Sequence, residues 1–213
     1  MILKNIELII FDVDGVLINS KRNMRLAFSK MCKKNKIRYL KFERYFKKIG
    51  IPFTKIMESL GITKNLNTLK KDYFRFSLYY RKEIKPYKKV YETLRLLEKD
   101  YKIAIVTSKS KKNTQNFLKY FFPKIKFKII CSPNRKLRPK PSPDMLLHVC
   151  KNLKIQPAKS VYVGDTLFDY KASKSSRMKF IFAKYGYFVN EKKIKTNYKI
   201  KKFSDILKIL IDA

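Results

Sequence analysis

The chain contains little of several residue types on which many active sites depend. It has one histidine, His148, so a mechanism that relies on histidine is disfavoured and we expect His148 to be structural. The three cysteines, Cys32, Cys131 and Cys150, are widely spaced and form no CxxC pair. We therefore expect buried thiols in a reducing compartment rather than disulfides or a zinc site.

Long apolar segments are also missing. No stretch reaches the roughly 18 uninterrupted apolar residues of a membrane span. The N-terminus leads into an apolar strand-like segment with no cleavable signal. We therefore expect a cytoplasmic protein, a monomer or homodimer, with no membrane partner. Its 213 residues, 45% of them hydrophobic, suffice for a full core and a small second domain.

Acidic residues are scarce: 16 stand against 52 basic ones, which gives a net charge of +36. Such a charge often indicates a nucleic-acid or anionic-membrane partner. Here, however, lysines occur throughout the chain, and arginine, the better ligand for phosphates, is rare. Lys, Ile, Asn, Tyr and Phe are abundant together, so we favour compositional drift toward residues with A- and T-rich codons. We expect only non-specific binding of polyanions and no specific nucleic-acid partner.

The most informative segment is residues 9–17, IIFDVDGVL. In a strand, positions two apart point to the same side, so Asp12 and Asp14 face one point beyond the strand end. Gly15 can adopt the positive φ of a sharp exit. Two like charges this close cost roughly 4 kcal/mol at an effective dielectric constant of about 20. The pair therefore requires a shared proton or a cation, and a divalent metal ion is the simplest solution.

Three later segments carry further polar residues. A second apolar strand ends in Thr107 and Ser108, Lys140 lies in RPKPSPD, and the strand VYVGD ends in Asp165, with Asp169 four residues on. In an open parallel α/β sheet, ligands bind at the carboxyl ends of the strands. We therefore expect these segments to meet Asp12 at one edge of the sheet.

In this order, DxDG, Thr, Lys and GDxxxD resemble the four motifs of the haloacid dehalogenase-like phosphohydrolase superfamily. The long insertion between the first two motifs resembles that of members with a helical cap. The resemblance covers nearly the whole chain and is greatest to the phosphoglycolate phosphatase and β-phosphoglucomutase-like branch. It implies Mg²⁺-dependent hydrolysis of a small phosphomonoester, such as 2-phosphoglycolate, a sugar phosphate or a nucleotide, through an aspartyl-phosphate.

Two alternatives stay open at this point. A phosphosugar mutase of the same branch would return the phosphoryl group to a sugar instead of water. A nucleic-acid-binding protein on the same scaffold would not need the catalytic residues, and their presence argues against it.

The resemblance also implies a role for each motif residue. Asp12 is the expected nucleophile, and Asp14 the acid that protonates the leaving oxygen and then the base that activates water. Asp165, together with Asp12 and the backbone carbonyl of Asp14, is expected to hold Mg²⁺. Thr107 and the N–H of Ser108 are expected to bind phosphoryl oxygens.

By the same resemblance, Lys140 supplies the remaining positive charge. Lys136 and Arg138 are rival candidates, but only Lys140 stands immediately before the PxPD segment. Asp169, three residues after Thr166, is typical of a capping box at the start of a helix. We therefore place Asp169 behind the metal ligands, where it would support them without binding the ion.

Apolar spacing predicts how the rest of the chain is organised. Residues 20–81 have helical character and are broken only at 50–52 and at Gly61, which predicts about four helices. Beyond them, helices alternate with strands, and a last helix covers 203–210. This alternation predicts an α/β fold with a doubly wound parallel sheet. The expected core comprises residues 1–18 and 84–213, and the inserted helical cap residues 19–83. The later strands are predicted over residues 103–106, 127–130, 161–163 and 180–183.

Substrate selection is expected in the cap, because contacts with the non-reacting part of a substrate orient it. In the related enzymes, the loop corresponding to residues 50–55, GIPFTK, reaches into the active site. Lys55, Arg25 and Arg44 are candidate contacts for an anionic substrate.

Overall fold

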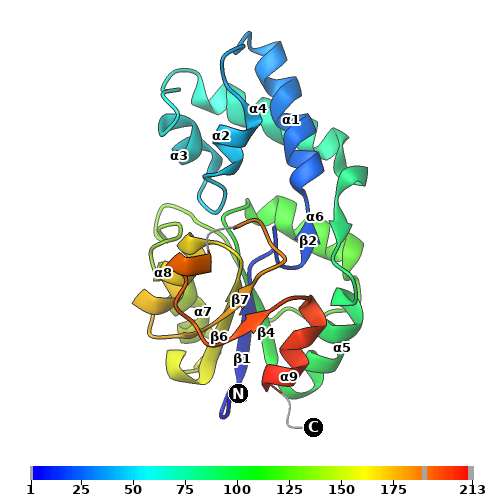
Figure 1. Ribbon diagram of the computed structural model, residues 1–213, viewed down its shortest axis with the longest axis vertical. Coiled ribbons are helices and arrows are strands. Elements are labelled where there is room, and N and C mark those ends of the chain that lie inside the picture. The colour runs from blue at the N-terminus through cyan, green and yellow to red at the C-terminus, as the bar shows by residue number, and fades with distance from the viewer. Residues whose placement is uncertain (1, 189–190, 211–213) are drawn as a thin grey trace.

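The computed structural model describes residues 2–188 and 191–210, and a six-stranded sheet forms its centre (Figure 1). The strand order is β5-β4-β1-β6-β7-β8, and every neighbouring pair is parallel. From β1 the chain first extends the sheet to one side and then returns to extend it on the other, so the carboxyl end of β1 lies at a topological switch point. The strands are β1 (Leu8–Phe11), β4 (Lys102–Val106), β5 (Ile130–Cys131), β6 (Ser160–Gly164), β7 (Lys179–Ala183) and β8 (Lys199–Ile200).

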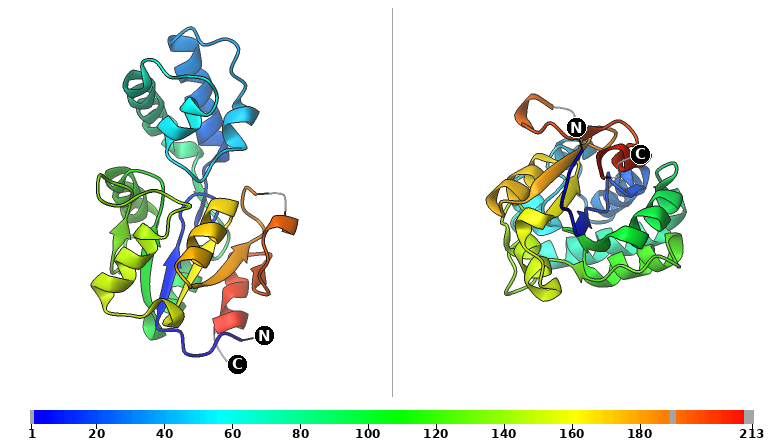
Figure 2. Two further views of the ribbon diagram at one scale, coloured as in Figure 1. Left: turned by 90° about the vertical axis from the view of Figure 1, so that its left-hand side faces the viewer. Right: turned by 90° about the horizontal axis from the view of Figure 1, so that it is seen from below.

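Helices cover both faces of this sheet (Figure 2). Successive residues of β1 face opposite sides, so Ile9 and Phe11 enter one apolar cluster while Leu8 and Ile10 enter the other. The first cluster includes side chains of α5, α6 and α9, and the second those of α7 and α8. The predicted doubly wound fold is confirmed. These helices are α5 (Val90–Asp100), α6 (Lys111–Phe121), α7 (Asp144–Leu153), α8 (Leu167–Ser175) and α9 (Leu207–Leu210).

Four helices with their own apolar cluster form a cap beyond the carboxyl ends of the strands (Figure 1). The two connections between cap and core pair as antiparallel strands, with Ile18 opposite Pro86 and Asn19 opposite Lys85. The predicted insertion, residues 19–83, contains all four helices. They are α1 (Lys21–Lys34), α2 (Phe42–Phe46), α3 (Phe53–Glu58) and α4 (Leu66–Tyr79), and the connecting strands are β2 (Ile18–Asn19) and β3 (Lys85–Pro86).

Some predicted boundaries were wrong. The strand expected over 127–130 is confined to β5, although the backbones of Lys128 and Ile129 still hydrogen-bond to β4. The helices that alternate with these strands begin at Val90 and at Asp144. Short 3₁₀ helices that apolar spacing did not reveal occur at Arg81–Glu83, Pro157–Lys159 and Glu191–Lys193. The helix predicted over 203–210 is present, with a 3₁₀ turn at Phe203–Ile206 that continues into α9.

The three cysteines and the single histidine form no disulfide and no metal-binding group among the described residues. Cys32, Cys131 and Cys150 are free and buried, as expected. His148 is exposed on α7, where its ring lies 3.3 Å from the Asn152 side chain. Among the described helices, none combines the length and the hydropathy that a membrane span requires.

Candidate active site

The first motif lies at the carboxyl end of β1, where the chain turns sharply. Asp12 is buried and Asp14 is largely buried. Gly15 has φ +89°, and a Cβ atom there would come within 2.1 Å of Asp165 Oδ2. Only glycine therefore permits both this turn and the close approach of the strand that carries Asp165.

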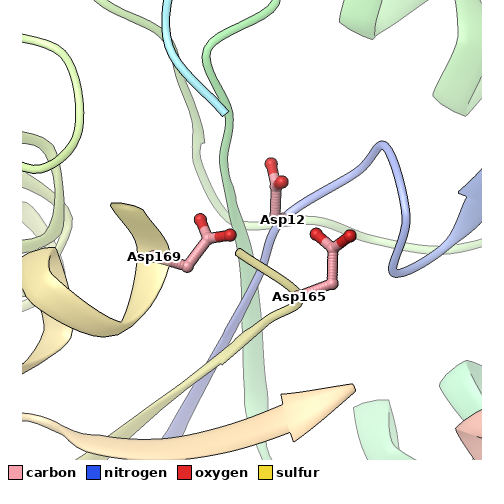
Figure 3. Close-up of side chains that lie close together, drawn as sticks. All are labelled: Asp12, Asp165 and Asp169. Carbon is pink, nitrogen blue, oxygen red and sulfur yellow. The ribbon is translucent and has the colours of Figure 1, made fainter. Parts of the chain in front are cut away.

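Three buried carboxylates converge at this edge of the sheet (Figure 3). Asp12 follows β1, Asp165 follows β6, and Asp169 belongs to the first turn of α8. Each contributes an oxygen to a group whose members all lie within 4.8 Å of one another. Three like charges at this distance repel strongly unless cations or protons neutralise them.

Asp169 is fully engaged by neighbouring donors. Its Oδ1 accepts hydrogen bonds from Lys140 Nζ at 2.6 Å and from the Tyr162 hydroxyl at 2.8 Å. Its Oδ2 accepts from the Thr166 backbone N–H at 2.9 Å and from the Thr166 hydroxyl, and the predicted capping box is present. These four bonds use the accepting capacity of the carboxylate. Asp169 therefore orients Lys140, and a metal ion would bind Asp12 and Asp165 instead.

Lys140 is the buried cation of the site, with an exposed fraction of 1%. Its Nζ lies 3.2 Å from Asp12 Oδ1 as well as 2.6 Å from Asp169. Burial lowers the pKa of Lys140, but the two carboxylates outweigh burial and hold the pKa above its usual value. The rival candidates lie elsewhere: Arg138 pairs with Asp144 at 2.8 Å on the surface, and Lys136 is exposed.

Two buried carboxylate oxygens in this cluster are open to a further ligand. Asp165 Oδ1 has no hydrogen-bond partner among the described residues, and Asp12 Oδ1 has only the 3.2 Å contact with Lys140 Nζ. Burial raises the pKa of Asp12 to about 7 despite the opposing charge of Lys140, and burial likewise raises the pKa of Asp165. Paired, desolvated carboxylate oxygens are the ligands that Mg²⁺ prefers, so these residues fit the ion.

Thr107 and Ser108 stand at the carboxyl end of β4, next to β1. Both line a cavity of about 80 Å³ together with Asp12, Asp14 and Lys140. The Ser108 hydroxyl is occupied, because it donates to a backbone carbonyl of the cap, that of Gly50, at 2.7 Å. The structure thus brings together the predicted motif residues at one cavity, with Asp165 and Asp169 directly behind it.

Three residues at this site were not predicted. Lys109 Nζ lies 2.8 Å from Asp14 Oδ1, and the Ser20 hydroxyl donates to the same oxygen at 2.5 Å. The Tyr187 backbone N–H donates to Asp165 Oδ2 at 2.7 Å, while its hydroxyl accepts from the Ser20 N–H at 2.7 Å. A signal existed for Tyr187, because the loop after β7 must reach the same edge of a parallel sheet.

The cap loop at residues 50–55 reaches the core. Gly50, Ile51 and Phe53 line the cavity, and Gly50 also packs against Thr166 and Phe168. A Cβ atom at Gly50 would lie 2.8 Å from the Phe168 ring, so a glycine is needed for this contact.

The three basic cap residues proposed as substrate contacts do not line this cavity. Arg25 pairs with Glu43 at 3.1 Å on the outer side of the cap, and Lys55 pairs with Glu58 at 3.0 Å. Arg44 is exposed on α2. Most exposed positions of this cap carry a lysine or arginine, so residue type does not identify its inner face, and a contact of these three residues with substrate stays a prediction.

Comparison with known proteins agrees with the geometry. The family model for haloacid dehalogenase-like hydrolases matches residues 9–183, and the chain belongs to this family of enzymes. A phosphoglycolate phosphatase of Aquifex aeolicus is 27% identical over 95% of both chains. One from Psychrobacter arcticus is 33% identical over 41% of this chain and 38% of its own length, and one from Nitrosococcus oceani matches over 41% of its length.

Solved structures share the fold. A haloacid dehalogenase-like hydrolase from Bacteroides fragilis superposes with a TM-score of 0.86 at 21% identity, covering 94% of this chain and 99% of that one. CbbY from Rhodobacter sphaeroides, determined in complex with phosphate, gives a TM-score of 0.83 at 18% identity and covers 94% and 96% of the two chains. At these identities the likeness concerns the fold.

Proposed function

We propose that this protein is a Mg²⁺-dependent phosphatase that hydrolyses a small phosphomonoester through an aspartyl-phosphate. The observation that carries the proposal is Asp12. Its carboxylate borders a cavity beneath the cap and lies 3.2 Å from the buried cation Lys140. A phosphoryl group placed there would meet a nucleophile and a neutralising charge together.

The reaction divides into two displacements. In the first, a carboxylate oxygen of Asp12 attacks phosphorus, the bond from phosphorus to the ester oxygen breaks, and Asp14 gives its proton to the departing alcohol. In the second, Asp14 takes a proton from water, whose oxygen displaces Asp12 and releases phosphate. Lys109 and Ser20, which both contact Asp14 Oδ1, fix the orientation of this acid and base.

The remaining residues stabilise the transferring group. Thr107 and the N–H of Ser108, which line the cavity, would donate to phosphoryl oxygens, and Lys140, held by Asp169, would offset their charge. Asp12, Asp165 and the backbone carbonyl of Asp14 would hold Mg²⁺. When bound, the ion neutralises carboxylate and phosphoryl charge at the reacting centre.

The experiment that tests the proposal is a phosphatase screen over a panel of phosphorylated metabolites in the presence of Mg²⁺. Release of phosphate from at least one small monoester, at rates far above those of the Asp12→Asn variant, is the expected result. No release from any ester, or equal release by the variant, would contradict the proposal.

Metal removal gives a prediction for Asp165. EDTA should abolish activity and added Mg²⁺ should restore it, because the repulsion among the buried carboxylates is then unbalanced. Asp165→Ala should lose Mg²⁺ binding in calorimetry and mimic the chelated enzyme. Asp100→Ala, which changes an exposed aspartate at the end of α5, close to the amino end of β4, is the control. Full activity of the chelated wild type would contradict the metal assignment.

Tyr187→Phe should affect proton transfer specifically. It removes the hydroxyl that holds Ser20, which in turn holds Asp14, but it keeps the ring and the backbone bond to Asp165. We expect kcat to fall about tenfold for an alkyl phosphate, which needs a proton on its leaving oxygen, and to change little for p-nitrophenyl phosphate. Tyr185→Phe, whose hydroxyl donates to the Val16 carbonyl, is the control. Equal losses for both esters would indicate a purely structural role for Tyr187.

A further inference from the structure

The cap contributes an apolar wall to the cavity. Tyr45, Phe53, Tyr73 and Phe74 present aromatic rings, and Met24 adds a thioether. Within the described part of the chain, no charged side chain of the cap lines this cavity. The part of a substrate that faces the cap therefore meets hydrocarbon.

The two tyrosines of this wall are neutral. Burial raises the pKa of Tyr45 and of Tyr73 far above the usual value, and the centroids of their rings lie 5.8 Å apart. Tyr73 also stacks on Phe53, with ring centroids 4.9 Å apart. These contacts fix the rings, and the wall offers a buried anion no positive charge.

The cations on the core side of the cavity are already paired. Lys140 contacts Asp12 and Asp169, and Lys109 contacts Asp14. A bound phosphoryl group adds further negative charge to these same contacts. A second anion on the substrate would therefore find no free positive side chain among the described residues that line the cavity.

The cavity is also small. Its volume is about 80 Å³, well below the roughly 300–1,000 Å³ that is typical of pockets for drug-sized ligands. With the cap in this position, the cavity therefore suits a small ester.

We propose that the alcohol released by this enzyme is small and uncharged and presents an apolar face to the cap. Esters whose alcohol carries a carboxylate, 2-phosphoglycolate included, are then poor substrates, although relatives bear the name phosphoglycolate phosphatase. The physical reason is desolvation, because an unpaired carboxylate buried against aromatic rings is strongly unfavourable. This inference rests on the proposed phosphatase function.

The test compares 2-phosphoglycolate with isobutyl phosphate, in which two methyl groups replace the carboxylate oxygens. The two esters have nearly the same shape, and glycolate is the better leaving group, so intrinsic reactivity opposes the expected preference. We expect kcat/KM for isobutyl phosphate to exceed that for 2-phosphoglycolate by at least about 100-fold, given the desolvation of an unpaired charge. Equal values, or a preference for 2-phosphoglycolate, would overturn the inference.

A cation placed in the wall should reverse this preference. Phe74→Lys, and independently Ile51→Lys in the half-buried loop, should each raise the ratio of kcat/KM for 2-phosphoglycolate to that for isobutyl phosphate at least about tenfold. Lys30→Ala, exposed on α1 and outside the cavity, should leave the ratio unchanged. Thermal unfolding shows whether each lysine variant is folded. If one of them is not, the other provides the test. An unchanged ratio of kcat/KM for the two esters in a folded variant would overturn the inference.

Failure of the underlying function gives a different result. If the protein hydrolyses neither ester nor p-nitrophenyl phosphate, the phosphatase proposal is overturned, and this inference with it. If it hydrolyses p-nitrophenyl phosphate but not isobutyl phosphate, only the inference about the alcohol is overturned.

Discussion

Asp12→Asn should abolish turnover while leaving the protein folded. The substitution keeps the shape of the side chain but removes the attacking carboxylate and one charge available to a metal ion. Because covalent catalysis by Asp12 has no substitute in the site, we expect kcat to fall by at least about 1,000-fold with any phosphomonoester. Phosphate release from p-nitrophenyl phosphate measures this loss without dependence on the cap.

The melting temperature of Asp12→Asn distinguishes a chemical effect of the substitution from a structural one. Burial raises the pKa of Asp12 to about 7, above its value in the unfolded chain. Ionisation of Asp12 therefore opposes folding as the pH rises through 7 when no cation is bound. In the metal-free protein at pH 8, the neutral asparagine should raise the melting temperature or leave it unchanged. Retention of most activity in this variant, or its unfolding, would contradict the role assigned to Asp12.

The sequence allowed the motif residues to be located because their placement depends on local rules. A run of apolar residues ends in Asp12, another in Thr107 and a third in Asp165, and parallel strands carry their carboxyl ends to one edge. The capping box of Thr166 and Asp169 is likewise a local pattern, and the structure confirms it.

Contacts that depend on how distant segments pack could not be predicted in the same way. Tyr187 reaches Ser20 across 167 positions of the chain, and Lys109 reaches Asp14 across 95. Lysine is so common here that its occurrence after Thr107 carried no information. For the same reason, Arg25 and Lys55 looked suitable as anion contacts, although acidic neighbours on the cap surface bind both.

The side chains of the cap that face the substrate could not be predicted from the sequence pattern. Its helices were predictable from apolar spacing, but spacing does not distinguish a side chain of the cap's own cluster from one that faces substrate. Tyr45, Phe53 and Tyr73 do both, because they belong to that cluster and also line the cavity. The same packing that stabilises the cap therefore defines the surface offered to the leaving group.

Lys140→Ala should lower turnover by several orders of magnitude, whereas Lys136→Ala and Arg138→Ala should have little effect. Lys140 is buried among carboxylates, where its charge acts at short range in a desolvated site. Arg138 pairs with Asp144 at the surface, where solvent screens the charge. The comparison is demanding because all three residues are basic and lie within five positions of one another. Steady-state kinetics with p-nitrophenyl phosphate measures the three effects.

Loss of Lys140 also leaves Asp12 and Asp169 without their buried cation, and removing one partner of a buried ion pair costs about 3–5 kcal/mol of stability. Lys140→Met fills most of the space and Asp169→Asn removes one opposing charge, so Lys140→Met with Asp169→Asn should recover much of the melting temperature. It should not recover turnover, because no cation then meets the phosphoryl group. If the double variant regained activity together with stability, Lys140 would only maintain the fold. Equal losses of turnover in the alanine variants of Lys136, Arg138 and Lys140 would show that general positive charge, not a specific contact, supports the reaction.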